Sequence, residues 1–150
     1  MKDIIPKLVE LFKNGYCTPQ IARIAKKIKE PSTTIQYNIK KMERERTIKT
    51  YKAVFDYKKI ERGHCTYLLI NLNQENYADP EKIAKEIAKN SEVESVDICT
   101  GDHELVVKLR SKDIDEYYAF IKMAVKNYGF SKVVSMTSLK QIKTEFVLSD

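Results

Sequence analysis

Apolar residues recur at helical spacing three times in the first 45 residues of the chain. The first run covers residues 3–13, where Asp3 is placed to cap the helix and Asn14-Gly15 to end it. The second run begins at Thr18-Pro19, an N-cap followed by proline, and continues to about Ile28. The third begins near Ser32 and presents Ile35, Ile39 and Met42 as one narrow apolar stripe. The pattern predicts three helices whose apolar sides face a common core.

Alternation of apolar and polar residues replaces the helical spacing after the third helix. Residues 47–55 follow this two-residue period, which predicts a strand that forms the edge of a wing. Residues 56–63 are polar, charged and end in glycine, and are predicted to be a linker. The predicted organisation is a first domain at 1–55, the linker at 56–63, a second domain at 64–143 and a tail at 144–150.

Two strand–helix–strand units follow one another in the second half of the chain. Their order predicts a ferredoxin-like βαββαβ domain, so that the whole chain belongs to the α+β class. Several of these strands are apolar on both alternations, which predicts a sheet whose second face is covered by another subunit in a homodimer. The predicted elements are strand 66–72, helix 79–88, strand 93–99, strand 104–109, helix 113–129 and strand 133–139.

Charge is distributed unevenly between the two halves of the 150-residue chain. The formal net charge is +6. Residues 1–63 contain 16 basic and 7 acidic side chains, a balance of +9, whereas residues 64–150 contain 11 and 14, a balance of −3. A basic half beside a mildly acidic one indicates that the first domain meets a polyanion. A lysine-rich solvated surface is the alternative interpretation, and charge alone does not decide between them.

The third predicted helix presents a polar ridge opposite its apolar stripe. Thr33, Tyr37, Lys40 and Arg44 form this ridge, and Gln36 and Lys41 lie beside it. Such a helix suits the major groove of double-stranded DNA, because glutamine pairs with adenine and the cations reach phosphates. A solvated helix face is the alternative, but a short helix–helix connection and a basic domain favour DNA contact.

Other functional classes lack their sequence signals. The third predicted strand, 104–109, has none of the aromatic residues by which an RNA recognition motif stacks bases. There is no phosphate-binding glycine loop and no Gly-x-Ser-x-Gly pattern, which argues against an enzyme. The three cysteines and two histidines are dispersed, so neither a metal site nor a cofactor is expected, and the cysteines are predicted to lie in the core.

Nothing in the sequence directs the chain to a membrane or out of the cell. Uninterrupted apolar runs such as Tyr67–Ile70 are far shorter than a membrane span. The first residues lack the apolar segment and small-residue cleavage site of a secretory signal. The expectation is a cytoplasmic protein.

Five segments together resemble a known family. In the first half these are Ile24–Ile28, Ser32–Glu43, Ile48–Ala53 and Asp56, and in the second half the strongest is Thr100-Gly101-Asp102-His103-Glu104, similar to a Thr-Gly-x-Tyr-Asp turn. In this order and spacing they resemble the Lrp/AsnC, or feast/famine, family of transcription regulators along nearly the whole chain.

The resemblance implies a winged helix-turn-helix domain followed by an effector-binding domain. It also implies dimers that form through the second domain's sheet and often assemble to octamers, with a small molecule, usually an amino acid, bound near the turn at a dimer–dimer contact. The candidate DNA-binding residues are Ser32, Thr33, Thr34, Gln36, Tyr37, Lys40, Lys41, Arg44 and Lys49. The candidate effector-binding residues are Thr100, Gly101, Asp102, His103, Glu104 and Ser135.

The chain departs from the family pattern at several of these positions. Lys29 and Arg46 stand where glycine is usual, and the turn at Lys29 must therefore avoid a positive φ or strain that residue. His103 and Glu104 replace tyrosine and aspartate in the turn. Ser135 lies where the last strand commonly has threonine. The alternative function is a metabolite-binding regulator whose winged helix docks a protein partner instead of DNA.

Overall fold

The structure is a computed structural model, and it describes residues 3–144. The chain divides into two compact units, with the boundary between Val54 and Phe55. Residues 145–150, which make up most of the predicted tail, lie outside the described residues. By its contacts, the segment predicted to be a linker belongs to the second unit, where Tyr57–Ile60 form one turn of 3-10 helix, η1.

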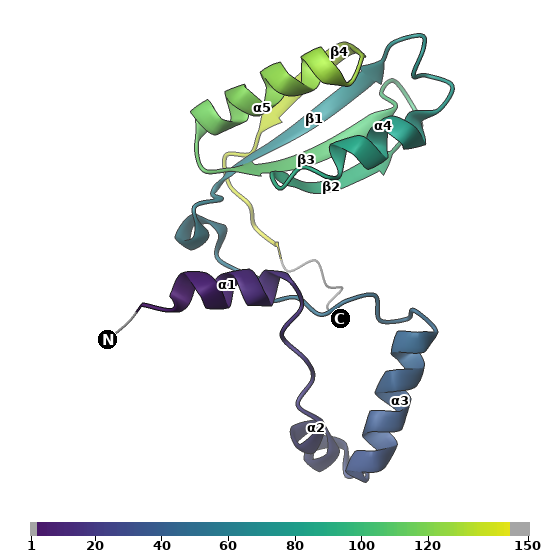
Figure 1. The fold of residues 1–150 in the computed structure, drawn as a ribbon, viewed down its shortest axis with the longest axis vertical. Helices are drawn as coiled ribbons and strands as arrows, with labels where there is room; N and C mark the ends of the chain where they lie inside the picture. The colour runs from purple at the N-terminus through teal and green to yellow at the C-terminus, as the bar shows by residue number, and fades with distance from the viewer. Residues whose placement is uncertain (1–2, 145–150) are drawn as a thin grey trace. The chain divides into compact units, whose positions relative to one another are not determined.

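The first unit contains the three predicted helices (Figure 1). They are α1 (Ile5–Lys13), α2 (Ile21–Ile28) and α3 (Ser32–Arg44). The prediction that Asp3 caps α1 is wrong, because the N-cap position is Ile4, which makes no side-chain cap; Asp3 Oδ1 lies one residue earlier and accepts a hydrogen bond from Ile5 N at 3.0 Å. The predicted start of α2 at Thr18-Pro19 is wrong, because α2 follows Gln20 and no side chain caps it.

Packing inside the first unit runs mainly between α2 and α3. Ile35 of α3 is its one buried described residue, at 5% exposure. The apolar side of α1 is not buried: Ile5, Leu8 and Leu11 are 66%, 38% and 42% exposed. The prediction that all three apolar stripes share a core is therefore wrong for α1, since helical spacing identifies an apolar side but not the surface that covers it.

The connection between α2 and α3 requires an unusual backbone conformation at Lys29. Its φ is +58°, in the left-handed region, and Glu30 N reaches back to the Ala25 carbonyl at 3.1 Å, as in a Schellman ending. Arg46 after α3 has a φ of +56°. Both residues thus adopt the conformation for which glycine is suited, at a cost of about 1 kcal/mol each.

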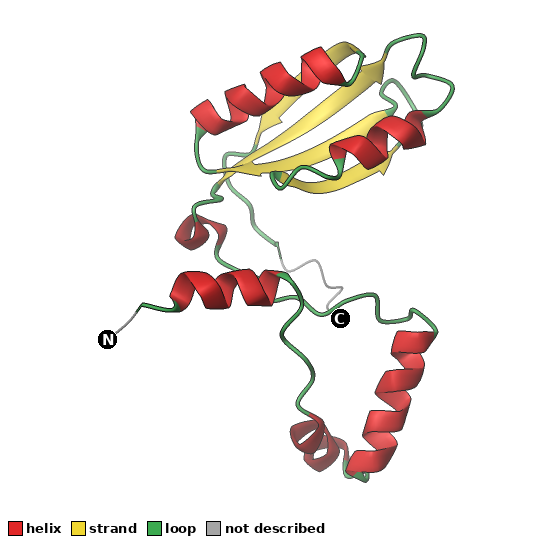
Figure 2. Ribbon diagram, viewed as in Figure 1, coloured by secondary structure: helices red, strands yellow, loops and turns green. Residues whose placement is uncertain are grey.

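The predicted wing strand at residues 47–55 is wrong. This segment has no strand and is drawn as loop in Figure 2. An alternating sequence becomes a strand only where a second strand satisfies its backbone groups, and none of the described residues pairs with it. The segment is held to α3 instead by Tyr51, whose hydroxyl donates to Glu43 Oε1 at 2.9 Å. Desolvation, followed by the Glu43 carboxylate, raises the pKa of Tyr51.

The second unit has the predicted βαββαβ order. Its strands form one antiparallel sheet in the order β2-β3-β1-β4. The last strand begins three residues earlier than predicted and ends two earlier, because Phe130 already pairs with Leu72. The elements are β1 (His64–Leu72), α4 (Pro80–Ile87), β2 (Val93–Ile98), β3 (Leu105–Ser111), α5 (Ile114–Asn127) and β4 (Phe130–Thr137).

Local signals set the helix ends in this unit. Asp79 Oδ1 accepts from Lys82 N at 3.3 Å at the start of α4, and Asp113 Oδ1 accepts from Glu116 N at 2.9 Å at the start of α5. Gly129 follows α5 with a φ of +63°. Asn73 and Asn76 side chains lie within 2.6 Å of the place where a Cβ would stand, so this turn requires glycine.

The core lies between one face of the sheet and the two helices. Both α4 and α5 lie across the same face (Figure 1), and Ile70, Leu105 and Val107 beneath them are 0% exposed. Residues on the other alternation are less covered: Tyr67, Leu69, Val106 and Val134 are half-buried and Met136 is 49% exposed. This second side of the sheet is called the open face below.

The three cysteines differ in their burial. Cys65 is buried and Cys17 half-buried, but Cys99 is exposed, so the prediction of a core position is wrong for Cys99. Cys99 lies at the end of an edge strand, where alternation no longer determines burial.

Among residues 3–144, no helix has the length and apolar character needed to cross a membrane.

Candidate nucleic-acid interface and effector loop

The exposed side of α3 is the candidate nucleic-acid interface. Because Ile35 and Ile39 turn one side of the helix inward, the remaining sides are solvated. All nine candidate DNA-binding residues are exposed, including Tyr37 at 65%. The ridge is called the α3 ridge below and consists of Thr33, Gln36, Tyr37, Lys40, Lys41 and Arg44.

The cations of the α3 ridge are not engaged by other described groups. Within residues 3–144, no hydrogen bond or ion pair involves the side chains of Gln36, Lys40 or Arg44. The acidic neighbour Glu43 is instead occupied by Tyr51. A positive surface of this kind attracts a polyanion, since no internal carboxylate neutralises it. Lys49, predicted to belong to a wing, lies exposed in the loop after α3.

The candidate effector loop joins β2 to β3. Gly101 has a φ of +100°, and no atom lies within 4 Å of where its Cβ would stand, so the turn needs glycine for its backbone conformation alone. The two sides of the loop are joined by the bond from Cys99 N to the Glu104 carbonyl at 2.9 Å. Glu104 N donates to the Ile70 carbonyl at 3.0 Å, which fixes the loop against β1.

Three of the candidate effector residues are tied to the protein itself. The Glu104 carboxylate accepts a hydrogen bond from Leu72 N at 2.8 Å. His103 Nδ1 lies 3.0 Å from Asn71 Oδ1, and the Asn71 amide donates to the Asp102 carbonyl. These contacts order the loop, and they leave the Asp102 carboxylate and the Thr100 hydroxyl as the exposed, uncommitted side chains.

Ser135 lies apart from this loop within the chain. It pairs with Leu68 on β4, and β1 separates β4 from β3, to which the loop belongs. Its hydroxyl makes a short hydrogen bond with the Tyr117 hydroxyl of α5. The structure therefore brings together residues 100–104 but does not bring Ser135 to them in one subunit.

A buried charged cluster on the open face was not predicted from the sequence. Arg110 of β3 makes a short ion pair with Glu94 of β2, whose other carboxylate oxygen lies 3.1 Å from Lys108 Nζ. The Arg110 side chain is only 5% exposed and its guanidinium carbon lies 3.5 Å from the ring centroid of Tyr57. Lys108 and Arg110 alternate with apolar residues in the sequence, which was the one available signal.

Burial in this cluster shifts two pKa values. Desolvation is the larger effect at both groups. Desolvation raises the pKa of Tyr57. The Glu94 carboxylate raises this pKa further, and the Arg110 cation lowers it. Desolvation also raises the pKa of the Cys65 thiol, opposed by Arg110 and Lys108. Cys65 therefore remains a neutral thiol at neutral pH and a poor nucleophile.

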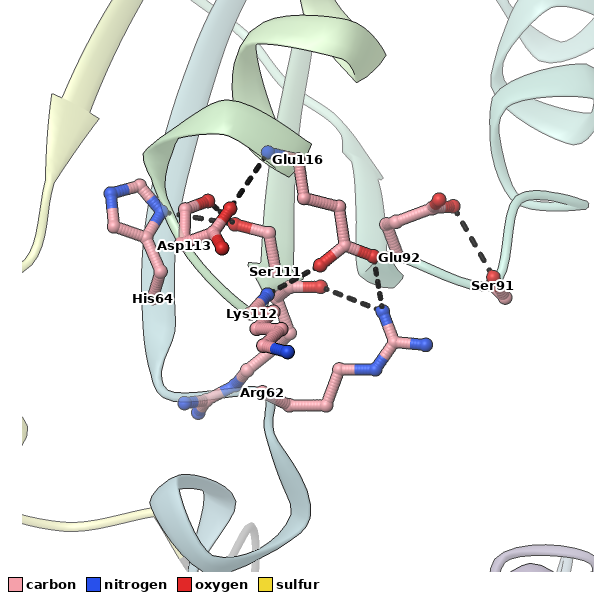
Figure 3. Close-up of polar contacts among 9 residues, drawn as sticks. Arg62, His64, Ser91, Glu92, Ser111, Lys112, Asp113 and Glu116 are labelled. Carbon is pink, nitrogen blue, oxygen red and sulfur yellow. Dashed lines mark hydrogen bonds and ion pairs between the residues drawn. The ribbon is translucent and has the colours of Figure 1, made fainter.

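A second network fixes the segment before β1 to the start of α5 (Figure 3). Arg62 Nη1 donates to the Arg110 carbonyl at 3.4 Å and to Glu116 Oε1 at 3.3 Å. The Glu116 carboxylate also accepts from Lys112 N. Arg62 thus connects the end of the segment after η1 with both the sheet and α5.

This geometry offers no arrangement for metal binding within the described chain. Residues 3–144 contain no group of three or more histidine, cysteine, aspartate or glutamate side chains close enough to hold an ion. What the structure does present is a solvated cationic helix in one unit and an ordered polar loop on the sheet of the other. The class that these features define is a two-unit α+β protein with one helical and one βαββαβ unit.

Comparison with known proteins identifies the family. The model of the Lrp/AsnC ligand binding domain matches residues 65–148, so the chain belongs to the Lrp/AsnC family. An uncharacterized HTH-type transcriptional regulator of Pyrococcus furiosus is 30% identical over 139 residues, which cover 92% of this chain and 91% of that protein. The resemblance that the sequence motifs predict is thereby confirmed.

Solved structures share the fold over almost the whole chain. An AsnC family transcriptional regulator from Agrobacterium tumefaciens superposes with a TM-score of 0.79 at 22% identity, covering 99% of this chain and 97% of that one. A feast or famine regulatory protein from M. tuberculosis, complexed with L-methionine, gives a TM-score of 0.77 at 12% identity and covers 86% of each chain.

Proposed function

We propose that this protein is a sequence-specific DNA-binding transcription regulator of the Lrp/AsnC type. The observation that carries the proposal is the α3 ridge, which is exposed, cationic and free of internal carboxylate partners among the described residues. A helix with amide and hydroxyl groups near its start and cations further along offers base contacts and phosphate contacts together. Family membership and an HTH-type regulator at 30% identity support this function.

The α2–α3 pair is the proposed helix-turn-helix, with α3 as the recognition helix. The contacts proposed for it are those of Ser32, Thr33, Thr34, Gln36, Tyr37, Lys40, Lys41 and Arg44, with Lys49 reaching the backbone from the following loop. Phosphate contacts from the lysines and arginine hold the helix in register, whereas Gln36 and the threonines read bases. A relative named as a transcriptional regulator over most of its length argues against catalysis as the primary role.

The β2–β3 loop is the proposed effector site, and a free amino acid the proposed ligand. Support comes from the L-methionine bound by the M. tuberculosis relative and from the loop's own geometry. Backbone N–H groups at the Gly101 turn suit a carboxylate, and the uncommitted Asp102 carboxylate suits an ammonium. Glu104 is the weaker candidate for the ammonium, because its carboxylate already accepts from Leu72 N.

A homodimer that packs two open faces together is the proposed assembly. The half-buried Tyr67, Leu69, Val106 and Val134 provide the apolar surface that such a contact needs. Further association to octamers would bring loops from different dimers together. In such an assembly Ser135 could lie near the effector loop of another subunit, although it lies apart from the loop of its own subunit.

A regulator whose helical unit docks a protein instead of DNA is the second candidate function. The observation that favours it is the exposed apolar side of α1, which a protein partner would cover. DNA binding depends steeply on salt because counterions are released, whereas docking through an apolar helix does not. Titration of a duplex over a range of salt concentrations therefore separates the two functions.

Selection of bound duplexes from a random pool tests the proposed function directly. The full-length protein is expected to enrich a pseudo-palindromic sequence, with half-sites about 34 Å apart or a multiple of that distance. A parallel selection with a mixture of the twenty amino acids should change the enrichment or the amount of DNA retained. Recovery of unselected sequence in both arms at low ionic strength would reject DNA recognition.

Gln36→Ala is expected to relax sequence specificity more than it lowers affinity. The side chain is exposed on α3 and its amide is the group suited to adenine, so its loss costs about 1–3 kcal/mol of discrimination at one base pair. Competition between the selected duplex and single-base variants measures this effect. Thr47→Ala, at an exposed position beyond α3, is the control and should leave the discrimination unchanged.

A further inference from the structure

A cavity of about 380 Å³ lies at the end of the sheet where β1 begins and β3 ends. It is enclosed by three parts of the second unit: the segment 55–58 before β1, the sheet residues Cys65 and Arg110, and the segment 138–144 after β4. The cavity lies at the opposite end of β1 from the effector loop, since Glu104 contacts Ile70 and Leu72. It is therefore a separate site from the one proposed above.

Arg110 in the cavity wall is held rigidly but is not fully bonded. Its Nε pairs with Glu94, its Nη1 donates to Gln141 Oε1 at 2.6 Å, and the plane stacks on Tyr57. Its Nη2 is buried and has no hydrogen-bond acceptor among the described residues. A buried guanidinium donor without an acceptor is costly, so this atom marks a place where an anionic oxygen would be stabilised.

The group that now faces Arg110 in this cavity is a neutral amide. Gln141 offers one oxygen to Nη1, and its Nε2 lies 3.3 Å from Cys65 Sγ. The Glu94 carboxylate pairs with Arg110 through one oxygen, at Nε, and its other oxygen faces Lys108. It therefore leaves Arg110 Nη2 without an acceptor among the described residues. A phosphate or carboxylate matches the fork of a guanidinium better than an amide does, since it places two charged oxygens opposite two N–H groups.

The remaining charged groups of the lining favour the same ligand. Lys58 and Lys140 contribute cations, against one carboxylate, Asp56. Asp56 Oδ1 is occupied by Lys58 N at the start of η1. The volume accommodates an anionic group with a small organic body.

We propose that this cavity is a binding site for a small phosphate- or carboxylate-bearing anion, held by Arg110 in place of the Gln141 amide. The ligand reaches the guanidinium when the Gln141 side chain turns away, and its oxygens then accept from Nη1 and Nη2. Because segments 55–58 and 138–144 both line the site, a bound anion stabilises the part of the chain through which the sheet is joined to the first unit.

Titration of the full-length protein with inorganic phosphate, and separately with acetate, tests the site at constant ionic strength set with chloride. The readout is the Arg110 ¹⁵Nε–H resonance in a heteronuclear NMR spectrum, assigned by its absence in Arg110→Lys. A saturable shift of this resonance is expected, and the anion that gives it at the lower concentration identifies the preferred group. No shift with either anion, or a shift that grows linearly without saturation, overturns the proposal.

Gln141→Ala provides the decisive variant, because it removes the competing amide and leaves Arg110 intact. We expect it to tighten binding of the preferred anion about fivefold, the equivalent of one neutral hydrogen bond. Ile142→Ala, at an 84% exposed position of the same segment that is not among the residues lining the cavity, is the matched control and should leave the affinity unchanged. Weaker binding in Gln141→Ala than in Ile142→Ala would show that the amide assists the ligand and would contradict the displacement.

Discussion

Lys40→Ala combined with Arg44→Ala is expected to lower affinity for duplex DNA by tenfold or more at physiological salt. Both side chains are exposed on the α3 ridge without a carboxylate partner among the described residues, so neither is needed to hold the helix. Each phosphate contact that is lost reduces the salt slope of binding by ~0.9, or ~1.8 for the pair. Fluorescence anisotropy of a labelled duplex, titrated at several salt concentrations, measures both quantities.

A matched variant separates this effect from a general loss of positive charge. Lys82→Ala with Lys126→Ala removes two exposed helix lysines from the second unit and leaves α3 unchanged. This pair should retain nearly the original affinity and slope. If the two double variants bind DNA equally well, the α3 ridge does not contact DNA and the protein-docking function gains support.

Glu94→Gln is expected to destabilise the folded protein by about 3 kcal/mol, because it leaves a buried arginine without its counter-charge. The carboxylate is 14% exposed and faces Arg110 and Lys108 at once. The amide retains the shape of the side chain but not the charge. Urea unfolding followed by circular dichroism measures the change, with the free energy taken from the midpoint and slope of the transition.

The exposed pair Glu81–Lys85 is the natural comparison for this buried cluster. Its side chains are 68% and 76% exposed at a separation of 3.4 Å, so Glu81→Gln should change stability by less than about 0.5 kcal/mol. Replacing both buried partners, Glu94→Gln with Arg110→Met, should recover part of the loss, since the Arg110 cation is then removed together with the Glu94 carboxylate. A Glu94→Gln variant as stable as Glu81→Gln would mean that Arg110 does not depend on Glu94.

The sequence predicted the second unit well because its signals are local. Asp79 and Asp113 stand at the starts predicted for helices 79–88 and 113–129, and each of the four predicted strands is found in the sheet. The last strand was placed three residues too late, since pairing with β1, not hydrophobicity, draws Phe130 into the sheet. The sequence left open whether the turn at Lys29 avoids a positive φ or strains that residue, and the structure shows the second outcome: Lys29 and Arg46, which stand where the family has glycine, both have a positive φ.

What the sequence did not predict depends on contacts between distant segments. Residues 47–55 alternate like a strand but have no described partner strand, so no strand forms. The Arg110 cluster joins β2, β3 and η1, three elements whose adjacency follows only from the sheet order. The roles assigned to the α3 ridge and to the β2–β3 loop stay predictions. The structure adds that the α3 ridge is exposed and that the loop has a defined backbone geometry.

The position of β1 limits how the two ends of the sheet communicate. This nine-residue strand, a span of roughly 30 Å, pairs with β3 from His64 to Ile70 and with β4 from Thr66 to Leu72. The candidate effector loop contacts one end of it, and the segment leading to the helical unit leaves from the other. A strand locked between two neighbours does not stretch or bend to relay a small local change. On the proposed function, a signal from the loop would travel as rigid-body displacement of whole sheets in the proposed assembly, and a variant kept monomeric should not respond to the effector.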